Sequence, residues 1–211
     1  MYDLRNLPLR STLAESSWIH SRSRPKPGVA AADERLGRLD LGEWIRTIRA
    51  VASAFGLGEY AEALRLGRAG YEAFSESNHR WGLITALCRI GFAALALGEP
   101  IEAAGNFRTA LERAHTSEAI SLELLALSGI GAALAETGKH EQAAPMLIFA
   151  LGHEQLPPAY DYARPALRAL EAELSPEDLA AARDAAAHAT LAELVQHALA
   201  AAPALTAAAS T

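Results

Sequence analysis

Residues 87–110 read LCRIGFAALALGEPIEAAGNFRTA, and residues 127–150 read LSGIGAALAETGKHEQAAPMLIFA, forty positions later. Both stretches place a glycine, Gly98 or Gly138, between two runs in which apolar residues recur at helical spacing. This pattern predicts two antiparallel helices joined by a short turn. A glycine at such a turn is typical of the left-handed position that ends a helix, where a Cβ would be strained. The sequence therefore predicts a stack of helix pairs.

An earlier copy of the turn, GLGEYAEA at 56–63, also resembles a dinucleotide-binding loop. Gly58 lies forty positions before Gly98, but Gly56 is replaced by Ala96 and Glu136 in the later copies. No strand pattern precedes the loop, which a dinucleotide site requires. We therefore interpret GLGEYAEA as a helix–helix turn. In this first copy glycines stand at 67 and 70, where apolar side chains are expected, so the second helix of this copy is the weakest in pattern.

The repeated residues resemble the tetratricopeptide pattern W-x2-L-G-x2-Y…A-x3-F. The second copy matches it with Leu87, Ile90-Gly91, Ala94, Gly98, Ala103 and Phe107, and the resemblance covers about 41–171. The period of 40 exceeds the usual 34, and the proline that closes each repeat is absent. HEAT repeats also have such a period, but the Ile-Gly and Ala-x3-Phe positions favour the tetratricopeptide family. The resemblance implies a right-handed, all-α solenoid, and we expect the extra residues to lengthen the second helix and its loop.

Composition supports an all-α fold and limits the function classes. The 211-residue chain is 51% hydrophobic but only 6% aromatic, which favours closely packed helices over a sheet. Its formal net charge of −6 gives no reason to expect direct nucleic-acid or membrane binding. The single cysteine, Cys88, fits a reducing compartment. The expectation is a cytoplasmic protein.

Four segments are expected along the chain. Residues 1–38 hold seven basic and four acidic residues and include SRSRPKPG, so a flexible basic segment is expected there. Repeats are expected over 39–174, capping helices over 175–201, and a disordered tail over 202–211. Ser175 and Thr190 begin the two capping helices as predicted N-caps.

The stretch EAELSPEDLAAARDAAAHATLAELVQHAL at 171–199 resembles the C-terminal close of the repeat regions in bacterial MalT-like and LuxR-type regulators and related multi-domain signalling proteins. In those proteins the repeats serve as a sensor or docking segment. No Walker A loop, cyclase domain or helix-turn-helix accompanies the repeats in this sequence, so the resemblance implies none of those activities.

The sequence contains no pattern typical of an active site or a metal site. Seven histidines are present, but pairs such as Asp184 with His188, or Glu193 with His197, supply two potential ligands where a site needs three or four. Ser128 in LSGIG does not match the nucleophile motif G-x-S-x-G. No catalytic residue, metal or cofactor is expected, and Cys88 is interpreted as a small buried thiol.

The expected function is non-catalytic binding of a protein or peptide in a concave groove, with self-association through the repeat surfaces left open. The alternative is a small-molecule-sensing fragment of a bacterial transcriptional regulator. The tetratricopeptide register implies a mildly apolar groove suited to an extended or helical peptide, with several of the same side chains alternatively filling the space between helices. The predicted groove residues are Ile45, Ile48, Phe55, Thr85, Cys88, Arg89, Phe92, Leu95, Leu125, Ser128 and Arg168.

Overall fold

The computed structural model describes residues 51, 54–153 and 162–207. Every regular element in these ranges is an α-helix, which confirms the all-α prediction for this part of the chain. The helices are α3 (Tyr60–Glu76), α4 (Arg80–Ala96), α5 (Pro100–Thr116), α6 (Ile120–Glu136), α7 (His140–Gly152), α8 (Arg164–Glu173), α9 (Pro176–His188) and α10 (Leu191–Ala207). The expected basic segment 1–38 lies outside the described residues.

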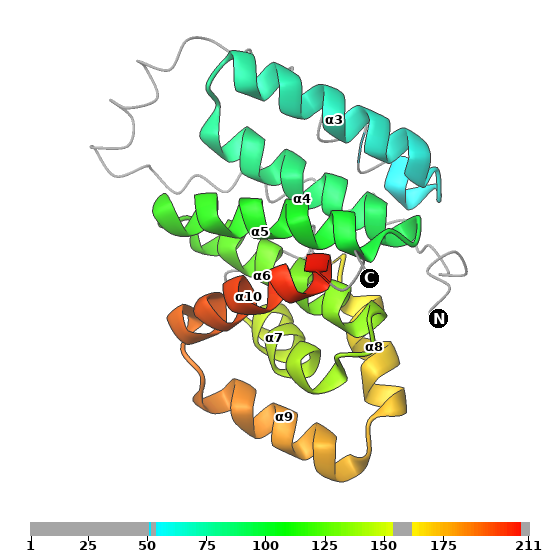
Figure 1. Ribbon diagram of the computed structural model, residues 1–211, viewed down its shortest axis with the longest axis vertical. Coiled ribbons are helices and arrows are strands. Elements are labelled where there is room, and N and C mark those ends of the chain that lie inside the picture. Colours follow the sequence, from blue (N-terminus) through cyan, green and yellow to red (C-terminus); the bar gives the residue numbers. More distant parts are fainter. Residues whose placement is uncertain (1–50, 52–53, 154–161, 208–211) are drawn as a thin grey trace, which may run out of the picture.

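The forty-residue period corresponds to two helices of 17 residues and two three-residue connections. Helices α3 to α7 each pack against the next helix in the chain, so the fold is a helical repeat (Figure 1). The expectation that the extra residues lie in the second helix and its loop is wrong, because α4 and α5 are equally long. The connections 77–79 and 117–119, which follow α3 and α5, are as short as the turn at Gly98, whereas 11 residues, 153–163, separate α7 from α8.

The glycine turns adopt the predicted left-handed conformation. The φ angles of Gly58, Gly98 and Gly138 are +76°, +81° and +77°. The chain also takes a positive φ of 53° at Asn78 and Glu118, which occupy equivalent places in the turns at the opposite ends of the helices. In the turns that the structure describes, both kinds therefore contain one left-handed residue, and only one kind uses glycine.

The left-handed conformation of these turns predicts opposite changes in stability for two substitutions. Gly98→Ala should lower the free energy of unfolding by about 1 kcal/mol, because an L side chain is strained at positive φ. Nothing lies within 4 Å of a Cβ at this position, so the backbone alone accounts for the loss. Glu118→Gly should raise the free energy of unfolding, because glycine is not strained at positive φ. The gain should be less than about 1 kcal/mol, since glycine also has more conformational freedom in the unfolded chain. Thermal unfolding of both variants measures this, and a Gly98→Ala protein as stable as the wild type would contradict the turn assignment.

Glycines inside the helices bring neighbouring helices close together. The side chain of Phe107 on α5 lies where a Cβ on Gly91 or Gly129 would clash, so one ring fills the space over α4 and α6. Leu147 on α7 lies in the same way against Gly131, forty residues after Gly91. The glycine at 67, where the repeat pattern expects an apolar side chain, has the same explanation, because Gly67 on α3 lies against Ile90. Helix α3 continues through it without a break.

The last two helices begin at the predicted N-caps. The hydroxyl of Ser175 accepts a hydrogen bond from the N–H of Asp178. At α10, the N–H of Thr190 donates to the Glu193 carboxylate and the N–H of Glu193 donates to the Thr190 hydroxyl, which completes the capping box. The hydrogen bonds from Thr190 hold the pKa of the Glu193 carboxyl below its usual value.

Helices α9 and α10 fold back along the array. Helix α9 packs against α7, while α10 packs against α5 and, to a lesser extent, against α6 (Figure 1). The buried side of α10 is formed by Leu194, Val195 and Ala198, as its apolar spacing predicted. The helix continues to Ala207, so it extends into the segment 202–211 in which a disordered tail is expected.

Candidate functional site

Most of the predicted groove residues lie in the protein interior. Ile45 and Ile48 are outside the described residues, Phe55 is half-buried, and Arg168 is exposed. The remaining predicted residues are all buried: Thr85, Cys88, Arg89, Phe92, Leu95, Leu125 and Ser128. Their burial is what the alternative interpretation predicts, in which these side chains fill the space between helices. That a partner binds these residues remains a prediction.

Aromatic packing accounts for part of this burial. The ring of Phe92 lies 4.7 Å from Phe107 and 5.2 Å from Tyr162, centroid to centroid. Tyr162 also lies 5.3 Å from Phe55, and the guanidinium of Arg89 sits 5.7 Å from the Tyr162 ring centroid. These contacts place Tyr162, two residues before α8, against α4. The predicted groove-facing side of α4 is therefore covered by side chains of the same chain.

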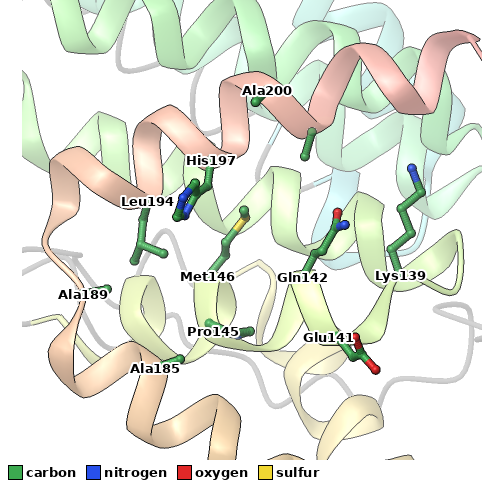
Figure 2. Close-up of a pocket in the computed structure, with 11 residues that line it drawn as sticks. Lys139, Glu141, Gln142, Pro145, Met146, Ala185, Ala189, Leu194, His197 and Ala200 are labelled. Atoms are coloured by element: carbon green, nitrogen blue, oxygen red, sulfur yellow. The ribbon is translucent and has the colours of Figure 1, made fainter.

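A groove of about 570 Å³ lies between α7, α9 and α10 (Figure 2). It exists because α10 packs against α5 and leaves its other side facing α7, while α9 packs against α7. Small side chains keep the space open. Its apolar lining comes from Pro145 and Met146 on α7, Ala185 on α9, Ala189 after it, and Leu194 and Ala200 on α10.

Polar groups lie beside Met146 and at one end of the groove. Figure 2 shows Met146 pointing from α7 toward α10, beside His197, whereas Lys139 and Gln142 extend from the start of α7 at the other end. Glu141 points away from α10. An occupant would therefore meet apolar side chains at the Leu194 end of the groove and hydrogen-bonding groups at the Lys139 end.

Pro145 is the sequence signal that could have drawn attention to this groove. It stands inside α7 and has no N–H to donate to the carbonyl of Glu141, four residues earlier. A proline in a helix interior costs stability, so the position calls for an explanation. The sequence does not reveal the rest of the site, because the groove depends on where α10 packs.

The other chemistry-bearing residues form no larger cluster. No group of three or more His, Cys, Asp or Glu side chains that could hold a metal ion occurs within the described ranges. His188 lies 3.3 Å from Asp184, but both side chains are largely exposed. Cys88 is fully buried, as expected, and burial raises the pKa of its thiol, which keeps it protonated. The described helices include none that is long and apolar enough to cross a membrane.

Comparisons with known proteins leave the family open. No protein-family model, curated protein or solved structure matches the chain. The tetratricopeptide resemblance therefore rests on the repeat residues of this sequence alone. The candidate binding surface rests on the groove between α7, α9 and α10 and on the residues that line it.

Proposed function

We propose that this protein is a non-catalytic scaffold that binds a protein or peptide, and that its binding site includes the groove between α7, α9 and α10. The observation that carries the proposal is the apolar lining of an open groove on a helical-repeat fold. Repeat folds commonly bind partners through extended surfaces. We further propose that the repeats are right-handed and of tetratricopeptide type, and that the chain acts in cytoplasmic signalling or transcription regulation; these proposals rest on the resemblance alone.

The groove fits an apolar anchor of a partner better than a polar one. Met146 and Leu194 are almost fully buried beneath it, so an apolar side chain inserted there would contact a packed surface and displace water. An amphipathic helix places such anchors at i, i+3, i+4 and i+7, and it satisfies its own backbone hydrogen bonds. We propose this form of partner in preference to an extended strand, because the described fold offers no sheet edge to extend.

Two substitutions on α9 test the proposal with a matched control. Ala185 lines the groove and Ala187 does not, although both are exposed and both lie in the last turn of the same helix. Ala185→Arg should place a long charged side chain in the groove and weaken partner binding by tenfold or more, about 1.4 kcal/mol. Ala187→Arg adds the same charge outside the groove and should leave binding unchanged.

The measurement is affinity capture with wild-type and variant proteins, followed by titration of the captured protein. A partner retained by the wild type and by Ala187→Arg, but lost by Ala185→Arg, supports the proposal. A partner that binds all three equally would show that the groove is not the site. Circular dichroism verifies that both variants keep the helical signal.

The second candidate function is small-molecule sensing. The groove volume lies within the range of about 300–1,000 Å³ that is usual for ligand pockets. A thermal-shift screen against metabolites separates the two candidates. A specific compound that stabilises the wild type but not Ala185→Arg, with no captured protein, would favour the sensor over the scaffold.

A further inference from the structure

Exposed apolar residues gather at one edge of the array, at the turns 57–59 and 97–99. The exposed fractions of Leu57, Leu97 and Ile101 are 68%, 41% and 37%, and these are three of the five large apolar side chains that are exposed in the described part of the chain. The two turns are neighbours, because a hollow of about 520 Å³ is lined by Glu59 of the first turn and Leu97 of the second. We call the residues 57–62 and 97–102 the turn edge.

The turn edge is also acidic. Glu59 and Glu99 are exposed and stand at equivalent places immediately before α3 and α5. Glu62 and Glu102 follow in the first turns of these helices, and each already pairs with an arginine at 2.6 Å. The carboxylates of Glu59 and Glu99 therefore remain to attract a basic partner beside exposed leucines.

The third copy of the turn ends this pattern. Thr137 stands forty residues after Leu97, and Lys139 stands forty residues after Glu99. Both the apolar and the acidic side chain are thus replaced at the third turn, so the acidic and apolar surface covers only the first two turns. The replacement also shows that this backbone accepts threonine and lysine at these positions.

The complementary segment on this chain is residues 1–38. It carries a net charge of +3, whereas the whole chain carries −6. Large apolar residues lie between its first three arginines, among them Leu9, Leu13 and Trp18. Fifty residues precede Val51, and 38 extended residues can span about 130 Å, several times the roughly 26 Å length of a 17-residue helix. The segment is therefore long enough to reach the turn edge.

We propose that the basic segment 1–38 docks on the turn edge of its own chain, with its leucines or Trp18 against Leu57 and Leu97 and its arginines beside Glu59 and Glu99. A second copy of the chain is a poorer occupant, because two turn edges facing each other would bring like charges together. The turn edge shares no residue with the groove between α7, α9 and α10, so this contact can fail without affecting the proposed function.

Limited trypsin digestion of the full chain tests the docking. Trypsin can cut after Arg10 and Arg22, each of which is followed by serine. The double variant Leu97→Thr/Glu99→Lys copies the residues of the third turn into the second. If the segment docks, cleavage at these two sites in the wild type is slower than in a free peptide of residues 1–38. Cleavage at the same two sites is then about fivefold faster in the double variant than in the wild type, because the rate of proteolysis follows the population in which the segment is undocked.

A matched control changes the opposite edge by the same charge. Trp81 and Glu118 are exposed at the other end of the helices, and Trp81→Thr/Glu118→Lys should leave the cleavage rate as in the wild type. Glu99→Lys alone should give a smaller acceleration and serves if the double variant does not fold.

Three results at a single protein concentration would overturn the proposal. They are equal cleavage of the wild type and the free peptide, equal cleavage of the wild type and Leu97→Thr/Glu99→Lys, and an equal acceleration by the control variant. A wild-type rate that rises on tenfold dilution would also overturn it, because protection would then come from a second molecule. Protection at every concentration that is lost only in the turn-edge variants supports docking within one chain.

Discussion

Replacing Phe107 with alanine is expected to lower the free energy of unfolding by about 3–5 kcal/mol. The ring is fully buried, lies against Phe92 at 4.7 Å and occupies the space that Gly91 and Gly129 leave above α4 and α6. Because two glycines form its floor, positions 91 and 129 carry no side chain that could help to fill the cavity. Helix α5 would lose its central contact with both neighbours.

Urea or thermal unfolding followed by circular dichroism measures the effect of Phe107→Ala. Trp81→Ala is the control, because its aromatic side chain is 54% exposed, and it should cost less than about 1 kcal/mol. A loss below about 1 kcal/mol for Phe107→Ala would mean that α5 does not pack between α4 and α6 in solution.

Phe92→Asp is expected to unfold the protein or to cost at least about 4 kcal/mol. The side chain is almost fully buried between Phe107 and Tyr162, so the carboxylate would lose its hydration, and the ring contacts with both aromatic neighbours would be lost. The conservative variant Phe92→Leu keeps the site apolar and should cost less than about 1.5 kcal/mol. Comparing the two separates the effect of charge from that of shape.

Phe92→Asp also tests whether the side of α4 that was predicted to bind a partner lies in the interior or in an open groove. If Phe92 formed part of an open groove, Phe92→Asp would fold normally and lose only its partner. The burial of Phe92 predicts loss of the helical signal instead. A folded Phe92→Asp protein with an unchanged melting temperature would contradict the packing of α4 and Tyr162 described above.

The repeat and its turns could be predicted from sequence because they depend on local backbone needs. A left-handed turn residue is restricted to few residue types, so Gly58, Gly98 and Gly138 mark the period directly. The N-caps at Ser175 and Thr190 are equally local. The repeat of the turn at Asn78 and Glu118 was missed because asparagine tolerates a positive φ, whereas the glutamate at the equivalent position gives no such indication.

The covered face of the array could be predicted only in part, because the sequence leaves open whether these side chains form a groove or fill the space between helices. The repeat register identifies which side of α4 and α6 faces the expected groove, but it does not show whether another part of the chain lies over that side. The sequence held a partial signal, because both helices are apolar on nearly every side. In the structure all their residues are buried apart from the first two of each and Glu136 at the end of α6. A helix that is apolar all round is normally interior. The groove beside α10 depends on contacts between distant segments, which no local pattern specifies.

Hydrogen exchange of the protein with and without its captured partner tests the proposed binding site most directly. The account predicts that the partner adds protection to peptides covering the start of α7 and the exposed sides of α9 and α10, around residues 139–146 and 185–201. Peptides from α4 and α6 should be protected already and should change little, because their residues are buried in the free protein. Added protection confined to α4 and α6, with α9 and α10 unchanged, would contradict the account and restore the predicted groove as the binding surface.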